Sequence, residues 1–244
     1  MLPQRFKCEP LPEFHDNYLW TLSNDDGFAV VVDPGDAQIV LQKMREGLKP
    51  IAIFITHHHP DHIAGLAELV QHCDAPTYAP DDLRIPIATH RVTHGQLILL
   101  PELDLEFRVI AVPGHTLSHV AYYGGDYLFC GDTLFSLGCG RLFEGTPEQM
   151  LNSLDLLAAL PAQTRVCSSH EYTLANLPFA EAAEPDNPKR DEIVRQIREK
   201  RRQNRPSLPS RIDIELSCNP FLRIDQQKLW PFWAQKSQLV SDKI

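Results

Sequence analysis

Paired cysteines are absent from this 244-residue sequence. Its six cysteines form no CxxC pair and are widely scattered, at Cys8, Cys73, Cys130, Cys139, Cys167 and Cys218. Structural zinc sites favour closed shells of closely spaced cysteines, so the sequence argues against such a site. Scattered thiols of this kind are typical of reduced side chains in the cytoplasm, which is the location that we expect.

Long apolar runs are absent as well. No stretch approaches the roughly 18 consecutive apolar residues of a membrane span, so we expect no membrane association. The start of the sequence, MLPQRFKCEPLPEF, has no apolar run after a basic end, so we also expect no secretory signal peptide. With 43% hydrophobic residues, the chain can form a well-buried core in one large domain, or in one domain with a small extension.

Basic residues are scarce in the first part of the chain. Residues 1–170 carry 10 Lys and Arg against 21 Asp and Glu, whereas residues 171–244 carry 13 against 11. Because nucleic-acid binding depends on neutralising phosphates, the acidic first part argues against a nucleic-acid partner. The second part would help to hold an anionic small molecule, although most of its charges are typical of a solvated helix face. This change in character predicts two domains, 1–170 and 171–244.

The hydrophobic pattern alternates between strands and helices. Strands are expected over 17–24 and 27–35, joined by the turn DDG, and a helix over 36–47 begins at the capping residue Asp36. The short apolar run IAIFI predicts a buried strand, and a helix over 63–73 follows it. Further along, we expect a strand over 103–112, a hairpin over 119–132, a helix over 146–160, a strand over 164–170, helices over 174–185 and 187–205, and a partly extended segment over 211–223.

Side chains that bind metals follow several of the predicted strands. THHHPDH follows the run IAIFI, and PGHT, FCGDT, SSHEY and VVDPG also come where strands end. Side chains alternate in an extended segment, so His57 and His59 point to one side and His58 to the other. Pro60 ends the strand, which lets the next residues turn toward the same rim. Ligands bind at such strand-to-helix loops in layered α/β folds, so we expect a metal site here.

Seven side chains of these motifs are candidate metal ligands: His57, His59, Asp61, His62, His115, Asp132 and His170. Imidazole and carboxylate groups suit zinc, iron or manganese rather than calcium, and zinc is the ion that we expect. Seven donors are too many for one catalytic centre and agree with two divalent ions that share one bridging ligand. The remaining histidines outside the motif are expected to be ordinary surface or core residues: His15, His72, His90, His94 and His119.

Four motifs, THHHPDH, PGHT, GDTLF and SSHEY, resemble the metallo-β-lactamase superfamily. Longer stretches resemble the glyoxalase II, or hydroxyacylglutathione hydrolase, family more closely, and the likeness runs nearly from end to end. These stretches are DNYLW, GDTLFSLGCGRLFEGTPEQM, HEYTLANLPFA and NPFLR. The resemblance implies an α/β fold, with a four-layer αββα sandwich in domain 1–170 and a small helical domain, 171–244, that helps to bind glutathione.

The resemblance also implies how the metal ligands are divided and what they do. The first metal ion would be held by His57, His59 and His115 and the second by Asp61, His62 and His170, with Asp132 as the bridge. A hydroxide between the ions would attack the thioester carbonyl of S-D-lactoylglutathione, and Asp61 would orient it. The products would be D-lactate and glutathione, which completes the removal of methylglyoxal. Because a thiolate leaves readily, no Ser or Cys nucleophile is needed.

Glutathione carries two carboxylates, so its site needs cationic donors. The resemblance assigns substrate contacts to Arg141 after GCG and to Tyr172 of HEY, and it places Phe143 where some relatives carry a tyrosine. Relatives usually end in a basic R-x-x-K-type pattern. In WPFWAQKSQLVSDKI, Lys236 would stand for the arginine, while Leu239 lies where the lysine is expected. The chain is expected to act as a monomer.

Other functions share parts of this pattern. A persulfide dioxygenase has the HxHxDH motif and a GCGR-like segment but uses a single iron ion, and oxygen uptake would reveal it. Lactonases and β-lactamase-like hydrolases share the fold, although the zinc β-lactamases usually carry a cysteine near the position of Asp132. A tRNA-processing nuclease is disfavoured by the acidic first part of the chain. A metal-binding module without catalysis would keep the ligands, and a turnover assay under varied metal supply separates it from an enzyme.

Overall fold

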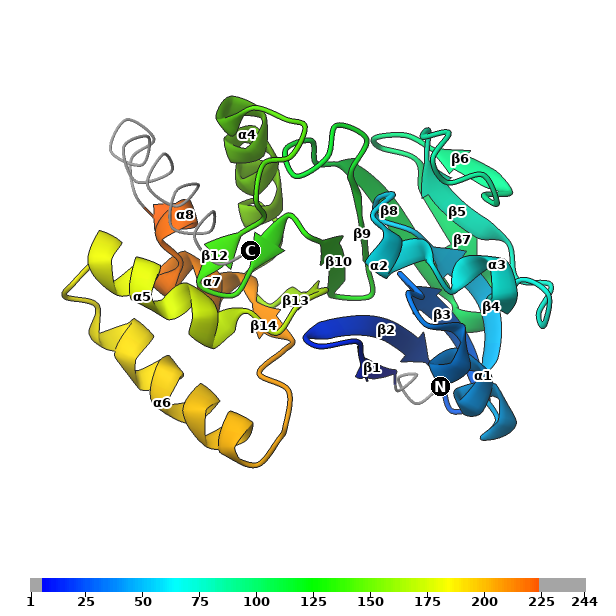
Figure 1. Cartoon of the computed structure of the whole chain (residues 1–244), viewed down its shortest axis with the longest axis horizontal. Helices are drawn as coiled ribbons and strands as arrows, with labels where there is room; N and C mark the ends of the chain where they lie inside the picture. Colours follow the sequence, from blue (N-terminus) through cyan, green and yellow to red (C-terminus); the bar gives the residue numbers. More distant parts are fainter. Residues whose placement is uncertain (1–5, 224–244) are drawn as a thin grey trace.

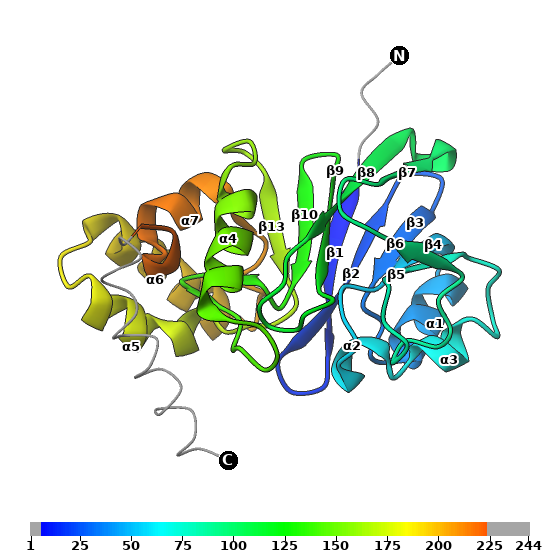
Figure 2. The same ribbon diagram turned by 90° about the horizontal axis from the view of Figure 1, so that it is seen from above.

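Two six-stranded β-sheets lie face to face at the centre of the computed structural model, which describes residues 6–223 of the chain (Figure 1, Figure 2). The first sheet contains, in spatial order, β1 (Lys7–Glu13), β2 (Asn17–Ser23), β3 (Phe28–Val32), β4 (Lys49–Phe54), β5 (Thr77–Pro80) and β6 (His90–Val92). The second contains β14 (Ser210–Arg211), β13 (Arg165–Ser168), β10 (Tyr127–Gly131), β9 (Val120–Gly124), β8 (Leu105–Ala111) and β7 (Leu97–Leu100). Both sheets are mixed, because β3 to β6 run parallel to one another and β13 runs parallel to β10.

Aromatic side chains fill the space between the two sheets. Phe54 of the first sheet stacks on Tyr122 of the second with ring centroids 4.3 Å apart, and it meets Phe107 edge-on at 5.1 Å. Trp20 crosses the interface and donates its indole N–H to the carbonyl of Ser168, with an N–O distance of 3.0 Å. Large buried aromatic rings contribute much of the stability of a hydrophobic core, so these contacts hold the two sheets at a fixed separation.

Helices cover the outer face of each sheet, which gives four layers in the order αββα (Figure 2). Helices α1 (Ala37–Arg45) and α3 (Leu66–Leu69) cover the first sheet, and α4 (Pro147–Ala158) covers the second. Val40 of α1 and Leu154 of α4 are fully buried in these outer cores. The four-layer sandwich expected from the resemblance is therefore confirmed.

The chain after His170 is mostly helical, as expected. Its helices are α5 (Thr173–Ala183), α6 (Pro188–Arg202), α7 (Ile212–Cys218) and α8 (Pro220–Arg223) (Figure 1). Leu177, Val194 and Cys218 from three of them pack together with Leu137. Strand β14 pairs antiparallel with β13, so this part of the chain also extends the second sheet. Within residues 6–223, no helix has both the length and the apolar character needed to cross a membrane.

Local sequence signals explain several element boundaries. The side chain of Asp36 accepts the main-chain N–H two residues on, at 2.9 Å, and so caps α1. The β9–β10 hairpin turns at Gly125 and Asp126, which both have positive φ, as a two-residue turn of this type requires. Thr146 and Gln149 form a capping box at the start of α4. These strands and helices were predicted, and the predictions are confirmed.

The single helix expected over 63–73 is wrong. The structure has two one-turn helices, α2 (Pro60–Ile63) and α3, with Gly65 between them. The N–H of Gly65 donates to the carbonyl of Pro34 at 3.1 Å, so it makes no bond within a helix. A Cβ at this position would lie 2.4 Å from the main-chain nitrogen of Ala37. Close packing against the start of α1 therefore interrupts the helical pattern.

The segment over 211–223 is also less extended than expected. Only Ser210–Arg211 pairs as a strand, and α7 and α8 follow. The alternating letters RIDIEL favour a strand, but Ile212 and Glu215 are both buried at helical spacing. The buried carboxylate of Glu215 accepts the main-chain N–H of Leu137 at 3.0 Å. This tertiary contact favours the helix over the local pattern.

Candidate metal centre

Seven side chains from four loops and one short helix meet at one edge of the sandwich. The loops follow β4, β8, β10 and β13, and α2 supplies the remaining pair. The side chains form three groups whose ligand atoms lie within 4.8 Å of one another: a first group of His57, His59 and His115, a second group of Asp61, His62 and His170, and a group of His57, His62 and Asp132 that overlaps both sites. The structure thus brings together all seven residues that the sequence singled out.

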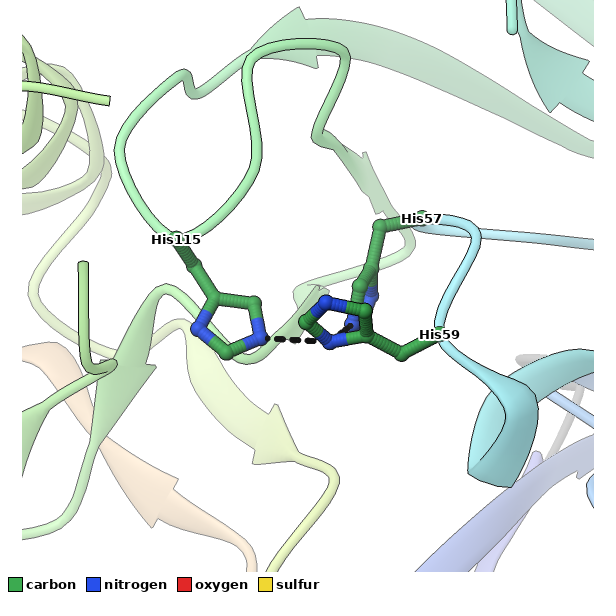
Figure 3. A group of neighbouring side chains, drawn as sticks. All are labelled: His57, His59 and His115. Atoms are coloured by element: carbon green, nitrogen blue, oxygen red, sulfur yellow. Dashed lines mark hydrogen bonds between the residues drawn. The ribbon is translucent and has the colours of Figure 1, made fainter. Parts of the chain in front are cut away.

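Three imidazoles make up the first group (Figure 3). His59 Nδ1 lies 3.1 Å from His57 Nε2 and 3.0 Å from His115 Nε2. One ring nitrogen has a single in-plane hydrogen-bonding direction, so hydrogen bonds cannot satisfy both neighbours at once. Burial lowers the pKa of all three rings, that of His59 to about 4, so each keeps a free lone pair at neutral pH. The donor set fits a metal ion.

The second group combines a carboxylate with two imidazoles. Asp61 Oδ2 lies 3.5 Å from His62 Nε2 and 3.6 Å from His170 Nε2. Within residues 6–223, neither His62 Nε2 nor Asp132 Oδ1 has a hydrogen-bond partner, although both atoms are buried. Buried polar atoms without partners are rare in folded proteins and point to a missing ligand. This group also fits a metal ion.

Asp132 lies between the two groups. Its Oδ2 is 3.3 Å from the Nε2 atoms of both His115 and His170, and its Oδ1 is 3.6 Å from that of His62. Burial alone would raise the pKa of this carboxyl, but His170 and His62 outweigh burial and hold the pKa well below its usual range. Conversely, Asp132 raises the pKa of His62 and His170 against the effect of burial, that of His170 to about 9. The geometry agrees with a ligand shared by two ions.

His119, expected to be an ordinary residue, lies directly behind this centre. Its ring stacks on that of His57 with centroids 4.6 Å apart, and its Nε2 accepts the main-chain N–H of Asp132 at 3.2 Å. It belongs to none of the three metal-type groups among residues 6–223. His119 therefore supports Asp132 and His57 without being a candidate ligand, and its place in a strand pattern gave no signal of this role.

Asp33 of the VVDPG stretch lies beneath the centre. Its carboxylate accepts the main-chain N–H and the hydroxyl of Thr56, both at 2.7 Å, and lies 3.0 Å from His62 Nδ1. It is fully buried and has a positive φ of 51°. Ligating histidines usually donate their second N–H to such a carboxylate, which fixes the ring and its tautomer. The sequence placed Asp33 among the metal-type residues, and the structure places it behind a ligand instead.

Three of the residues predicted to contact substrate, Arg141, Phe143 and Tyr172, lie around the centre. The Phe143 ring lies 5.2 Å from the rings of His59 and His115 and is 59% exposed. The Arg141 guanidinium lies 5.1 Å from the Phe143 ring, and Tyr172 stacks on His170 at 4.6 Å. Lys236 and Leu239 lie outside the described residues.

His58 points away from the seven donors, as the alternation predicts. Its ring nitrogens lie 3.6 Å from carboxylate oxygens of Asp82 and Glu144.

Two side chains that could serve as nucleophiles are not available for that role. The hydroxyl of Ser118 donates to Asp82 at 2.6 Å, and Cys139 is buried. Neither Ser118 nor Cys139 therefore presents an exposed nucleophile at the centre.

Comparisons with known proteins give the superfamily. Residues 15–170 match the model of the metallo-beta-lactamase superfamily, and residues 171–242 match that of the hydroxyacylglutathione hydrolase C-terminus. Among solved structures, the B3 metallo-beta-lactamase BLEG-1 is 27% identical, with a TM-score of 0.67 over 90% of this chain and 100% of that chain. ETHE1 from Myxococcus xanthus is 23% identical, with a TM-score of 0.70 over 95% and 91%, and shares the fold. The chain thus belongs to the metallo-β-lactamase superfamily and has its fold.

Curated relatives give the narrower family. Hydroxyacylglutathione hydrolase of Nitrosomonas eutropha is 51% identical over 89% of this chain and 85% of that protein. The protein of the same name from Xanthomonas campestris is 53% identical over 88% and 84%. The chain belongs to the hydroxyacylglutathione hydrolase family of metal-binding hydrolases.

Proposed function

We propose that this chain hydrolyses the thioester of S-2-hydroxyacylglutathiones, with S-D-lactoylglutathione as the main substrate, and releases D-lactate and glutathione. The observation that supports this most is the convergence of seven donors with Asp132 between two groups, in a chain about half identical to relatives of that name. We further propose that the enzyme works in the cytoplasm as a monomer, and that its reaction completes the removal of methylglyoxal. In this proposal 1–170 is the catalytic domain and 171–244 helps to bind glutathione.

Two divalent ions, zinc in our proposal, would occupy the centre. The first would be held by His57, His59 and His115, the second by Asp61, His62 and His170, and Asp132 would reach both. When bound, such ions supply Lewis acidity, which polarises a carbonyl and lowers the pKa of water by several units.

The chain itself positions the reacting groups. Asn17 donates to Asp61 Oδ2 at 2.8 Å, which leaves Asp61 Oδ1 to accept a hydrogen bond from the attacking water and to orient it. A thiol leaving group has a pKa near about 8.5, so it departs as thiolate without a dedicated acid. We therefore assign no nucleophilic role to Ser118, Ser168 or Cys139.

Substrate binding is assigned to the rim of the centre. The Arg141 guanidinium is exposed and offers a planar pair of donors to a glutathione carboxylate. Burial raises the pKa of the Tyr172 hydroxyl well above its usual range, so that hydroxyl remains a neutral donor. Phe143 supplies an apolar wall, since it has no hydroxyl to bind the substrate.

Arg141→Ala should raise KM for S-D-lactoylglutathione by about 10-fold or more, because a charge-assisted hydrogen bond contributes roughly 1.5–3 kcal/mol. Metal content should stay unchanged, since only the main-chain carbonyl of Arg141 meets a candidate ligand, His115 Nδ1, at 2.7 Å. Steady-state kinetics and elemental analysis on one sample measure both. Arg108→Ala, on an exposed position of β8, is the control. An unchanged KM would remove Arg141 from the substrate site.

The direct test is turnover of S-D-lactoylglutathione with metal content measured on the same preparation. We expect hydrolysis with two ions per chain, loss of activity on treatment with a chelator, and recovery when zinc is returned. A single iron ion with oxygen uptake and no hydrolysis would instead identify a persulfide dioxygenase. Two bound ions without hydrolysis would contradict the proposed substrate.

A further inference from the structure

The two groups of candidate ligands are supported by different kinds of residues. In the first group, His57 Nδ1 lies 3.0 Å from the hydroxyl of Thr56, and His115 Nδ1 lies 2.7 Å from the carbonyl of Arg141. These partners are neutral. In the second group each ligand has its own side-chain partner, and two of the three partners are carboxylates: Asp33 for His62, Asp16 for His170 and the amide Asn17 for Asp61.

Asp16 and Asn17 are neighbours at the start of β2, and they reach two different ligands. Asp16 Oδ1 lies 3.0 Å from His170 Nδ1, and Asn17 Nδ2 donates to Asp61 Oδ2 at 2.8 Å. Within residues 6–223, no hydrogen bond of these two side chains reaches His57, His59 or His115. One dipeptide thus contacts the second group alone.

Main-chain bonds hold this dipeptide against the segment that carries His170. Tyr18 N–H donates to the carbonyl of Ser169 at 2.7 Å, and Glu171 N–H donates to that of Asp16 at 2.9 Å. Asn17 and His170 form an isolated antiparallel bridge between these two bonds. These main-chain bonds therefore fix the positions of Asp16 and Asn17 relative to His170, whatever occupies the centre.

Each contact fixes one property of its ligand: the tautomer of His170 in one case and the side-chain rotamer of Asp61 in the other. A carboxylate at Asp16 favours the tautomer of His170 in which Nδ1 carries the proton, and this leaves the Nε2 lone pair facing the centre. The Asp61 side chain is 38% exposed, so burial alone does not fix its rotamer. Asn17, with 7% of its surface exposed, donates to one oxygen and holds that rotamer.

We propose that Asp16 and Asn17 are positioning residues for one metal ion only, the ion held by Asp61, His62 and His170. The inference rests on the two-ion centre of the proposed function, but it concerns binding and not turnover. The DNY motif at the start of β2 then determines how tightly that ion is bound. Binding of an ion by His57, His59 and His115 does not depend on this motif.

The test is a zinc titration of metal-free Asp16→Ala and Asn17→Ala proteins against a competing chelator, which yields two dissociation constants for each. One constant should rise by about 10–100-fold, the usual cost of losing a partner behind a ligand, and the other should stay within about threefold of the wild type. Cobalt(II) titration gives a second readout, because its absorption spectrum differs between an imidazole-only and a mixed carboxylate site. Circular dichroism checks that each variant is folded.

Tyr18→Phe is the matched control. It removes a hydrogen bond of 2.8 Å between Tyr18 and Glu171, hence between the same two segments, but touches no candidate ligand. It should keep both constants. Asp16→Asn retains an acceptor oxygen for His170 Nδ1–H and should lie between Asp16→Ala and the wild type.

Equal weakening of both ions, no weakening, or the same change in Tyr18→Phe would overturn the inference, as would a wild-type chain that binds a single zinc ion. No substrate is present in the titration, so its result does not depend on whether the proposed activity is correct. Selective loss of one ion in a chain that hydrolyses no glutathione thioester would refute the activity and leave this inference standing.

Discussion

Asp132→Ala should lower the metal content and reduce turnover of S-D-lactoylglutathione by more than about 100-fold. Loss of a residue behind a ligand costs about 10–100-fold, and Asp132 contacts candidate ligands of both groups directly, so its loss is expected to exceed that range. Its Oδ2 lies 3.3 Å from both His115 and His170, and no other carboxylate among the seven donors lies between the groups. Without it, each ion would have only three protein donors. Elemental analysis and an initial-rate assay on the same sample measure the two effects.

Asp74→Ala, an exposed carboxylate after α3, is the control and should change neither quantity. Within residues 6–223 the buried Asp132 side chain contacts His62, His115 and His170 but makes no hydrogen bond to the main chain, so the variant should fold, which circular dichroism checks. A folded Asp132→Ala protein that retains two ions and the full rate would show that the bridge has been assigned to the wrong residue.

The clustering of the seven candidate ligands was predictable, in the first place because the geometry of the THHHPDH motif is local. Alternation along an extended segment separates His57 and His59 from His58, and Pro60 begins the one-turn helix α2 that carries Asp61 and His62. The other candidate ligands follow β8, β10 and β13, which run in the same direction, so the carboxyl ends of these three strands meet at one edge. A histidine that follows one of these strands is therefore expected to lie near the motif, as His115 and His170 do.

Residues that act only through tertiary contacts gave a weaker signal. Asp16 and Asn17 belong to the quoted DNYLW stretch, but their role depends on Asp61 and His170, far away along the chain. The same physics explains the errors in the fold, since Gly65 interrupts a helical pattern through its contact with the start of α1. Strand β1 was missed because its sequence KCEPLPE contains two prolines, which an edge strand tolerates.

Asp33→Ala should destabilise the metal-free protein by about 3–5 kcal/mol, the usual cost of breaking a buried charged network. The change leaves the N–H and hydroxyl of Thr56 and the Nδ1 of His62 without their acceptor in a fully buried place. Alanine must also adopt the positive φ of 51°, which adds about 1 kcal/mol. Urea unfolding with a chelator present measures this loss apart from any stabilisation by bound zinc.

Zinc affinity should fall in the same variant by about 10–100-fold, because His62 loses the carboxylate that fixes its tautomer and its orientation. Asp33→Asn separates the two effects. Asparagine tolerates a positive φ and keeps one acceptor oxygen for Thr56, so most of the stability should remain. It has no negative charge to offer His62, so zinc affinity should still fall. If Asp33→Ala kept wild-type stability and Asp33→Asn kept wild-type zinc binding, Asp33 would be neither the structural nor the electrostatic support of the centre.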